Sequence, residues 1–168
     1  MYKRQIRAGL APIVAAIFPV PKIALLPLFI IWFGIGELSK VNLILFGTLF
    51  PTIIATYGAI DNVDRSLIRM GQSFNLSWYS ITKKIILPAS LPAILSSMRI
   101  TAAIAIILIV AAELIAAEKG IGAYIQMAGS LFAIDRLLAG VIILSCLGLI
   151  ANWLIGFAEK KLLKWRNR

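Results

Sequence analysis

The chain has 168 residues, of which 61% are hydrophobic, its formal net charge is +10 and its mean hydropathy is +0.95. A soluble domain is only about half apolar, so this composition excludes an ordinary soluble protein and predicts an integral membrane protein. The basic residues lie at the ends of apolar runs, where they face lipid headgroups, and this placement argues against nucleic-acid binding.

Four apolar stretches predict membrane spans. Residues 41–60 are free of charge and would cover about 30 Å as a helix, which is one hydrocarbon core. Residues 137–158 form a second charge-free run, and residues 91–117 form a third that one arginine and one glutamate interrupt. Residues 23–36 form a shorter apolar stretch. We count it as a span because four spans fit the alternation of segments rich and poor in basic residues, with both ends of the chain on the same side. The prediction is an all-α, polytopic transmembrane helix bundle with residues 1–168 in a single domain.

Lysine and arginine are unevenly distributed among the segments that flank these spans. Three segments are rich in basic residues: the start (Lys3, Arg4, Arg7, Lys22), residues 61–90 (Arg65, Arg69, Lys83, Lys84) and the tail (Lys160, Lys161, Lys164, Arg166, Arg168). Two segments are poor: the loop between the first and second spans holds only Lys40, and the loop between the third and fourth holds Lys119 and Arg136. The positive-inside rule therefore predicts a multi-pass protein of the bacterial inner membrane with both termini in the cytoplasm. The basic tail is also suited to binding anionic membrane lipid.

The cytoplasmic segment 61–90 carries its own signals for a first helix. Asp61 or Asn62 can cap the N-terminus of this helix, and Asp64 would then lie in its first turn. Apolar residues follow at helical spacing, namely Val63, Leu67, Met70 and Phe74. Asn75 falls where the helix should end, because asparagine tolerates the left-handed conformation that closes helices.

A second short helix is predicted directly after this turn. Ser77 can cap it, and its apolar face would consist of Trp78, Ile81, Ile85 and Ile86. Pro88 limits its continuation, and Pro92 suits the first turn of the next membrane helix. Such a helix pair either lies on lipid or docks onto a partner protein, and the residues alone leave both interpretations open.

Several kinds of chemistry are excluded by the residue types. The sequence has no histidine and one cysteine, Cys146, so it offers no disulfide framework, Cys/His metal site or histidine-based catalysis. It has no G-x-x-x-x-G-K-[ST] phosphate loop, so the chain itself should not hydrolyse nucleotides. We therefore expect no catalytic residue, no metal and no cofactor, and an intramembrane enzyme is disfavoured.

The stretch RMGQSFNLSWYSITKKIILPASLP resembles the EAA loop of ABC importer permeases. That pattern reads roughly E-A-A, three residues, Gly, nine residues, Ile, any residue, Leu-Pro. Aligning it on Leu87 and Pro88 puts Asn75 on the motif glycine. Arg69, Met70 and Gly71 then occupy the three E-A-A positions in that order. Arginine in place of glutamate reverses a charge, so any ion pair that this glutamate makes with the ATPase in relatives is in question here.

Two further stretches narrow the resemblance. IALLPLFIIWFGIGELSK resembles the third membrane helix region of nitrate/sulfonate/taurine-type permeases, and VAAELIAAEKGIGAYI resembles the segment after their fifth helix. Relatives carry six spans and are about half as long again, and the opening MYKRQ does not fit the family. We therefore expect an N-terminally truncated form with four spans, and a naturally short permease is the alternative.

The resemblance implies a non-catalytic transport subunit. In such importers two permeases pair, here as a homodimer, a cytoplasmic ABC ATPase dimer docks beneath them, and a periplasmic or lipid-anchored binding protein delivers the solute. ATP-driven alternating access would carry a small anionic solute inward. The residues implied in ATPase coupling are Asn75, Leu76, Ser77, Trp78, Tyr79, Ile85, Leu87 and Pro88. If Trp78 does not contact the ATPase, the alternative is an aromatic residue at the level of the lipid headgroups. The competing function for the whole chain is a truncated, transport-inactive membrane scaffold.

Two charges lie inside the third predicted span. Arg99 and Glu113 would each cost about 2.5–3.5 kcal/mol at a helix centre. They are fourteen residues apart, about 21 Å along a helix, so they cannot pair with each other. Glu113 either lines the outer solute pathway or is an interfacial carboxylate. Arg99 either anchors the helix at the cytoplasmic side or lies near the path of an anionic solute.

Overall fold

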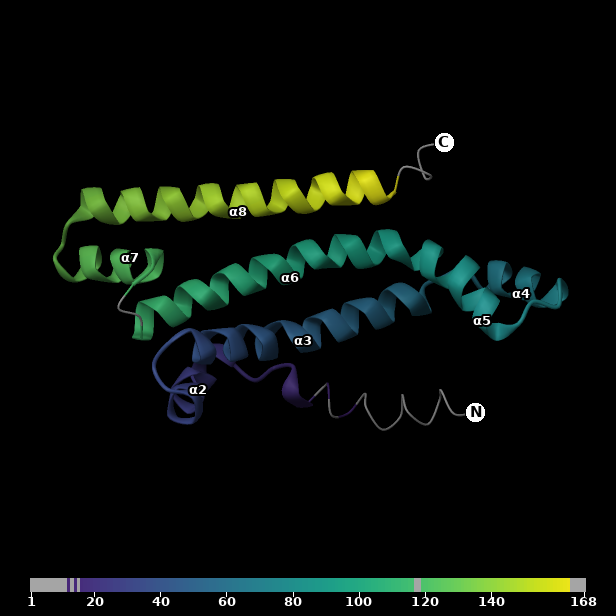
Figure 1. Ribbon diagram of the computed structural model, residues 1–168, viewed down its shortest axis with the longest axis horizontal. Coiled ribbons are helices and arrows are strands. Elements are labelled where there is room, and N and C mark those ends of the chain that lie inside the picture. Colours follow the sequence, from purple (N-terminus) through teal and green to yellow (C-terminus); the bar gives the residue numbers. More distant parts are fainter. Residues whose placement is uncertain (1–11, 13, 15, 117–118, 164–168) are drawn as a thin grey trace. The chain divides into compact units, whose positions relative to one another are not determined.

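The computed structural model describes residues 12, 14, 16–116 and 119–163. Helices make up its regular structure, and the described ranges contain no strand, which confirms the all-α fold class. The elements in chain order are the 3-10 helix η1 (Lys22–Leu25), α2 (Leu26–Phe33), α3 (Glu37–Asp61), α4 (Arg65–Ser73), α5 (Trp78–Ile81), the π-helix η2 (Thr82–Ile86), α6 (Leu87–Ala116), α7 (Ile121–Ser130) and α8 (Ile134–Leu162) (Figure 1).

Three helical segments are long and apolar enough to cross a membrane. They are α3, with 25 residues, the continuous helical stretch Trp78–Ala116, with 39, and α8, with 29. These segments coincide with three of the four predicted spans. The fourth region contains only the twelve-residue apolar helix Lys22–Phe33. Gly34 ends it with a φ of +78°, and a single helix needs about 20 residues to cross a bilayer, so a crossing at residues 23–36 stays a prediction.

The chain divides into two compact units. One comprises Met1–Pro51 and Ala103–Leu149, and the other comprises Thr52–Ala102 and Ile150–Arg168. Each of the three long helices contributes one part to each unit, so the boundary cuts across helices and follows no linker. The single domain expected over residues 1–168 therefore stays a prediction.

The first unit has an apolar core around α2. Leu26 and Phe29 of α2 pack with Leu43 of α3 and Ala112 of α6, and all four are buried. Close to this core, Lys40 is nearly buried and its ammonium group forms an ion pair with Glu37 at 2.8 Å. The apolar face of α2 thus packs on helices that are themselves long enough to span, although α2 alone is short.

The second unit holds the loop between α3 and α6, whose helical structure is continuous where we expected a break. Pro88 was predicted to limit the second short helix, but the helix runs without interruption from α5 through η2 into α6. The turn before the proline widens, and the Leu87 amide bonds the Thr82 carbonyl. Pro88 has no N–H and its ring clashes with the carbonyl four residues earlier in an α-helix, so a wider turn accommodates it.

Candidate functional site

Residues 61–90, here called the coupling loop, contain a capped helix near their start. An Asp64 carboxylate oxygen accepts a hydrogen bond from the Ser66 amide at 2.8 Å and so caps α4. We expected Asp61 or Asn62 to be the cap, but α3 continues through Asp61, so the expectation was wrong by two to three residues. The backbone hydrogen bond from Ser66 lowers the pKa of the Asp64 carboxyl below its ordinary value of 3.8.

Asn75 closes α4 as the sequence predicted. Its φ is +53°, in the left-handed region, and its amide bonds the Gln72 carbonyl at 2.9 Å. The Leu76 amide bonds the Gly71 carbonyl at 3.1 Å. These two bonds are the pair that defines a Schellman motif, which satisfies the last carbonyls of a helix. The chain therefore turns sharply at Asn75, and α5 starts only three residues later.

Ser77 caps α5, which confirms another predicted signal. Its hydroxyl oxygen accepts a hydrogen bond from the Ser80 amide at 3.3 Å. A cap of this kind contributes about 0.5–2 kcal/mol to helix stability. Because the left-handed turn and the cap are two residues apart, local chemistry fixes the direction of the chain through the whole tip of the coupling loop.

The coupling loop has a small apolar core of its own. Val63, Ile81 and Ile86 are buried there, and Ile68 and Ile85 pack against them. A Cβ placed at Gly71 would lie 2.7 Å from Ile85 Cδ1 and 3.3 Å from Ile81 Cγ1. The α4 and α5–η2 helices touch at Gly71, so an alanine there would require the end of the Ile85 side chain to shift and a larger residue would separate the helices.

The predicted apolar stripe of the first helix divides into two parts. Val63 is buried, whereas Leu67, Met70 and Phe74 are exposed. The cause is that Ile68, one position away from Leu67, supplies the contact with the core. Of the residues predicted for the second helix, Ile81, Ile85 and Ile86 face the core and Trp78 is 47% exposed.

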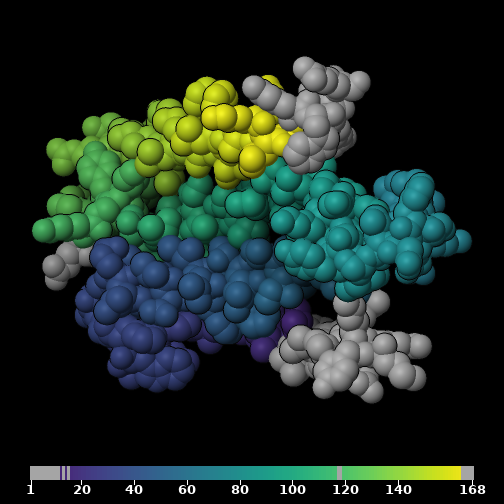
Figure 2. Space-filling model, turned by 45° about the vertical axis from the view of Figure 1, so that its right-hand side comes forward, coloured from purple at the N-terminus to yellow at the C-terminus, as the bar shows by residue number. Residues whose placement is uncertain are grey.

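Five large apolar side chains remain exposed around the turn, and we call them the tip surface. Its members, with their exposed fractions, are Met70 (51%), Phe74 (74%), Leu76 (38%), Trp78 (47%) and Tyr79 (73%). They belong to the coupling loop, shown in teal in the space-filling view (Figure 2). Contiguous exposed apolar residues mark surfaces that meet a protein or a membrane. Of the residues implied in coupling, Leu76, Trp78 and Tyr79 lie on this surface, whereas Asn75 and Ser77 shape it.

The three remaining coupling candidates lie away from the tip. Ile85 packs inside the loop, Leu87 is 48% exposed at the start of α6, and Pro88 is half-buried beside it. The structure thus separates the motif into a tip that is available for contact and an exit that leads into the membrane helix. Met70 and Phe74 were absent from our set of coupling residues, although their place in the predicted stripe could have indicated them.

Glu113 has a structural partner that the sequence did not suggest. In the first unit its carboxylate accepts a hydrogen bond from the Gly122 amide, in the first turn of α7, at 2.8 Å. A Cβ at Gly120, whose φ is +127°, would lie 2.5 Å from the Glu113 carboxyl carbon, and one at Gly122 would lie 2.9 Å from the Val110 carbonyl oxygen. The two glycines therefore give the carboxylate room to cap α7.

Arg99 also has a partner. In the second unit its guanidinium forms an ion pair with Glu159 of α8 at 2.6 Å. A Cβ at Gly156 would lie 2.9 Å from Arg99 Nη2, so the absence of a side chain there lets the guanidinium pass across α8. The partners are 60 residues apart in sequence, and spacing arguments within one helix cannot find such a pair. Arg99 and Glu113 thus have separate structural partners, and their roles in a solute pathway stay predictions.

Comparison with known proteins identifies the family. The profile of the family described as "Binding-protein-dependent transport system inner membrane component" matches residues 1–164. The chain is 36% identical over 166 residues to the permease protein SsuC of Bacillus subtilis, whose name refers to aliphatic sulfonates transport, and this covers 99% of the chain and 60% of that protein. It is 36% identical over 162 residues to the taurine transport system permease protein TauC of Escherichia coli, covering 96% and 59%.

The chain spans about three fifths of the length of these curated relatives. The profile match nevertheless extends through nearly all of its residues, and the spanning helices and the loop between α3 and α6 lie within it. The chain therefore belongs to the family of binding-protein-dependent transport system inner membrane components, the permeases of ABC transporters, and within it resembles the sulfonate and taurine type.

Proposed function

We propose that this chain is the membrane-spanning subunit of an ABC importer that carries a small organic anion inward by alternating access, driven by a separate ATPase. The family supports the importer, and the names of two relatives, which refer to aliphatic sulfonates and taurine, support an anionic solute. The active assembly would contain two copies of the chain, an ABC ATPase dimer below the membrane, and a periplasmic or lipid-anchored binding protein above it. Both termini would lie in the cytoplasm.

The observation that carries the proposal is the continuous helix from the tip surface into the membrane. Trp78–Ala116 is helical throughout, so no flexible connection separates the tip from α6. A displacement of the tip by an ATPase would therefore move the cytoplasmic end of α6 directly. The small core around Ile81 holds α4 against the start of this continuous helix. The π-helix η2 lies between tip and span, where a local change in winding would alter the angle between them.

The tip surface also fits a protein partner by its chemistry. Aromatic residues such as Trp78 and Tyr79 dominate the energetics of protein interfaces, and central ones contribute about 2 kcal/mol or more. The opposite interpretation, in which the tip lies in the lipid headgroups, predicts that these aromatic residues contact acyl chains even when the ATPase is present. The two interpretations therefore differ in a measurable environment for the same side chains.

The first test is co-purification of the ATPase with membrane-inserted variants. Trp78→Asp and Leu76→Asp should abolish association with the ATPase and solute uptake, because a charge would replace a buried anchor, while Trp78→Phe should retain most of both. Phe132→Asp is the matched control, since Phe132 is 89% exposed in the turn between α7 and α8 and its replacement should leave ATPase association intact. Normal association of both tip variants would refute the docking proposal.

The second test places spin labels at positions 76 and 78 in a Cys146→Ser background. Addition of the ATPase should exclude both oxygen and water-soluble relaxation agents from the labels. Contact with acyl chains that persists in the presence of the ATPase would favour the lipid interpretation instead. If association and burial are normal but no solute is transported, the chain would act as a transport-inactive membrane scaffold.

A further inference from the structure

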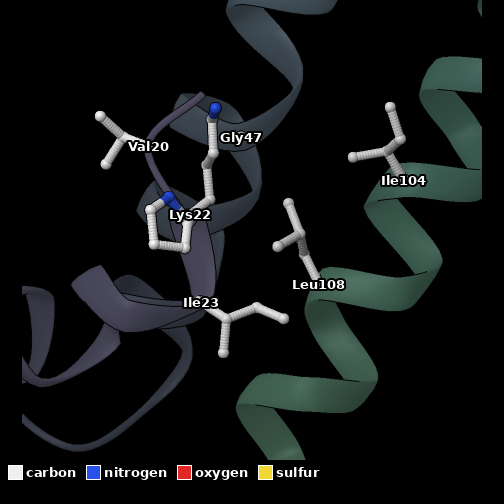
Figure 3. A pocket seen from close by; sticks show the side chains of 7 residues that line it. Val20, Lys22, Ile23, Gly47, Ile104 and Leu108 are labelled. Atoms are coloured by element: carbon white, nitrogen blue, oxygen red, sulfur yellow. The ribbon is translucent and has the colours of Figure 1, made fainter. Parts of the chain in front are cut away.

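A small hollow in the first unit is lined in part by a lysine side chain. Its volume is about 230 Å³, and it is lined by Val20, Pro21, Lys22, Ile23, Gly47, Ile104 and Leu108. Leu108 and Ile104 project from α6 toward the Lys22 side of the hollow (Figure 3). The stem of Lys22 packs on α3, since a Cβ at Gly47 would lie 3.7 Å from Lys22 Cγ. Apart from the lysine, the lining is apolar.

The residues that α3 and α6 contribute to the hollow lie within the charge-free runs of those helices. Gly47 is six residues inside the charge-free run that begins at Val41, about 9 Å from its start. On α6, Ile104 and Leu108 occupy the middle of the charge-free section between Arg99 and Glu113. We assigned Lys22 to the cytoplasmic flank of the first predicted span, and its side chain packs against residues within the charge-free runs of α3 and α6. Lys22 is the first residue of the 3-10 helix η1, which leads directly into the short helix α2.

The positive charge of Lys22 has no acidic partner in the part of the chain that the structure describes. Its ammonium group donates hydrogen bonds to the carbonyl oxygens of Ile17, at 3.4 Å, and Phe18, and it lies 5.3 Å from the centroid of the Phe18 ring. An ammonium group has three donors, so these carbonyls leave one donor unused and neutralise no charge. Ionisable residues within membrane spans are costly and mark pathways for ions and substrates.

We propose that Lys22 and this hollow form a transient binding site for a small organic anion during translocation. The site would take an oxyanion headgroup, such as a sulfonate, on the ammonium group and a short apolar tail against Ile104 and Leu108. The volume of about 230 Å³ suits a solute of a few heavy atoms. The proposal rests on the proposed function, whose solute it describes more closely, and it assigns the charge recognition to Lys22 instead of Arg99 or Glu113.

Charge-selective labelling of a cysteine in the hollow tests this site. Full-length Ile104→Cys in a Cys146→Ser background, in lipid nanodiscs, is treated with the anionic 2-sulfonatoethyl methanethiosulfonate or its cationic trimethylammonioethyl analogue. The ratio of anionic to cationic labelling rates should fall by about tenfold when Lys22→Gln removes the charge, and Lys22→Arg should preserve it. Butanesulfonate should slow labelling in the parent protein, and butylammonium should not.

Two controls keep the result interpretable. A cysteine at Phe132, far along the chain in an exposed turn, should show the same rate ratio with and without Lys22→Gln. Gly47→Ala retains Lys22 but places a methyl group against Leu108, so it should remove protection by butanesulfonate. The proposal would be overturned if the ratio of anionic to cationic labelling rates at position 104 did not change with Lys22→Gln. It would also be overturned if a cysteine at this position reacted with neither reagent.

The labelling experiment needs neither the ATPase nor the binding protein, so its failure is distinct from failure of the proposed function. A chain that binds its ATPase through the tip surface but shows no charge preference would lose only the Lys22 site. A chain that shows the preference but never associates with an ATPase would lose only the importer mechanism.

Discussion

The contact between Glu113 and α7 gives the sharpest prediction. Glu113→Ala removes the acceptor of the Gly122 amide, a hydrogen bond of 2.8 Å, and leaves that donor in the first turn of α7 without its cap. Loss of an N-terminal cap costs about 0.5–2 kcal/mol, and a buried donor left without a partner costs about 1–3 kcal/mol. Gly122 is buried, so we expect about 1.5 kcal/mol for local opening, which corresponds to roughly a tenfold faster exchange of this amide.

Hydrogen–deuterium exchange of the protein in nanodiscs measures this change in peptides that cover residues 119–130. Glu113→Gln is the matched control, because it keeps an oxygen acceptor and removes the charge. The expected order of exchange rates at Gly122 is wild type slowest, glutamine intermediate and alanine fastest. Unchanged exchange in Glu113→Ala would refute the capping role. If Glu113→Gln instead abolished solute uptake with exchange unaltered, the carboxylate would belong to the solute pathway.

Three other predictions concern the coupling loop and its unit. Asn75→Gly should leave the loop as stable as before and Asn75→Ala should cost about 1 kcal/mol, because glycine and asparagine tolerate a φ of +53° whereas alanine is strained there. Limited proteolysis at the tip measures this difference. Arg99→Glu should lower the thermal midpoint, and adding Glu159→Arg should restore it by reversing the pair. The pKa of the Asp64 carboxyl is lowered in the folded protein. Its cap should therefore stabilise α4 fully above pH 3.8 and be lost as the pH falls through the lower folded pKa. Circular dichroism of the protein should register this change as a loss of helix content.

Local signals predicted the coupling loop well. The turn at Asn75 and the cap at Ser77 depend on hydrogen bonds between residues at most five positions apart, so sequence reasoning can find them. The error at Asp64 has the same origin, because several acidic and amide residues compete for one cap and the length of α3 decides between them. The continuous helix across Pro88 was not predictable from propensity, since a π-turn compensates for the missing amide.

Long-range contacts could not be predicted from the sequence. The pairing of Arg99 with Glu159 needs two helices to be placed side by side, and the sequence shows only that each bears a charge. Gly120 and Gly122 were interpreted only as part of the family-like stretch VAAELIAAEKGIGAYI, and their function as space for the Glu113 carboxylate became visible only in three dimensions. The packing of Lys22 against α3 and α6 was hidden for the same reason, because counting charges between spans does not show where a short helix packs.

The core that the coupling loop forms around Val63, Ile81 and Ile86 has a thermodynamic consequence. A segment that is already folded loses little conformational freedom when it is captured, so more of the contact energy of its surface is retained as affinity. A partner could release and recapture such a surface in every transport cycle without waiting for the segment to refold. A disordered connection of the same length would lose affinity to ordering and would absorb, instead of transmit, any movement applied to its end.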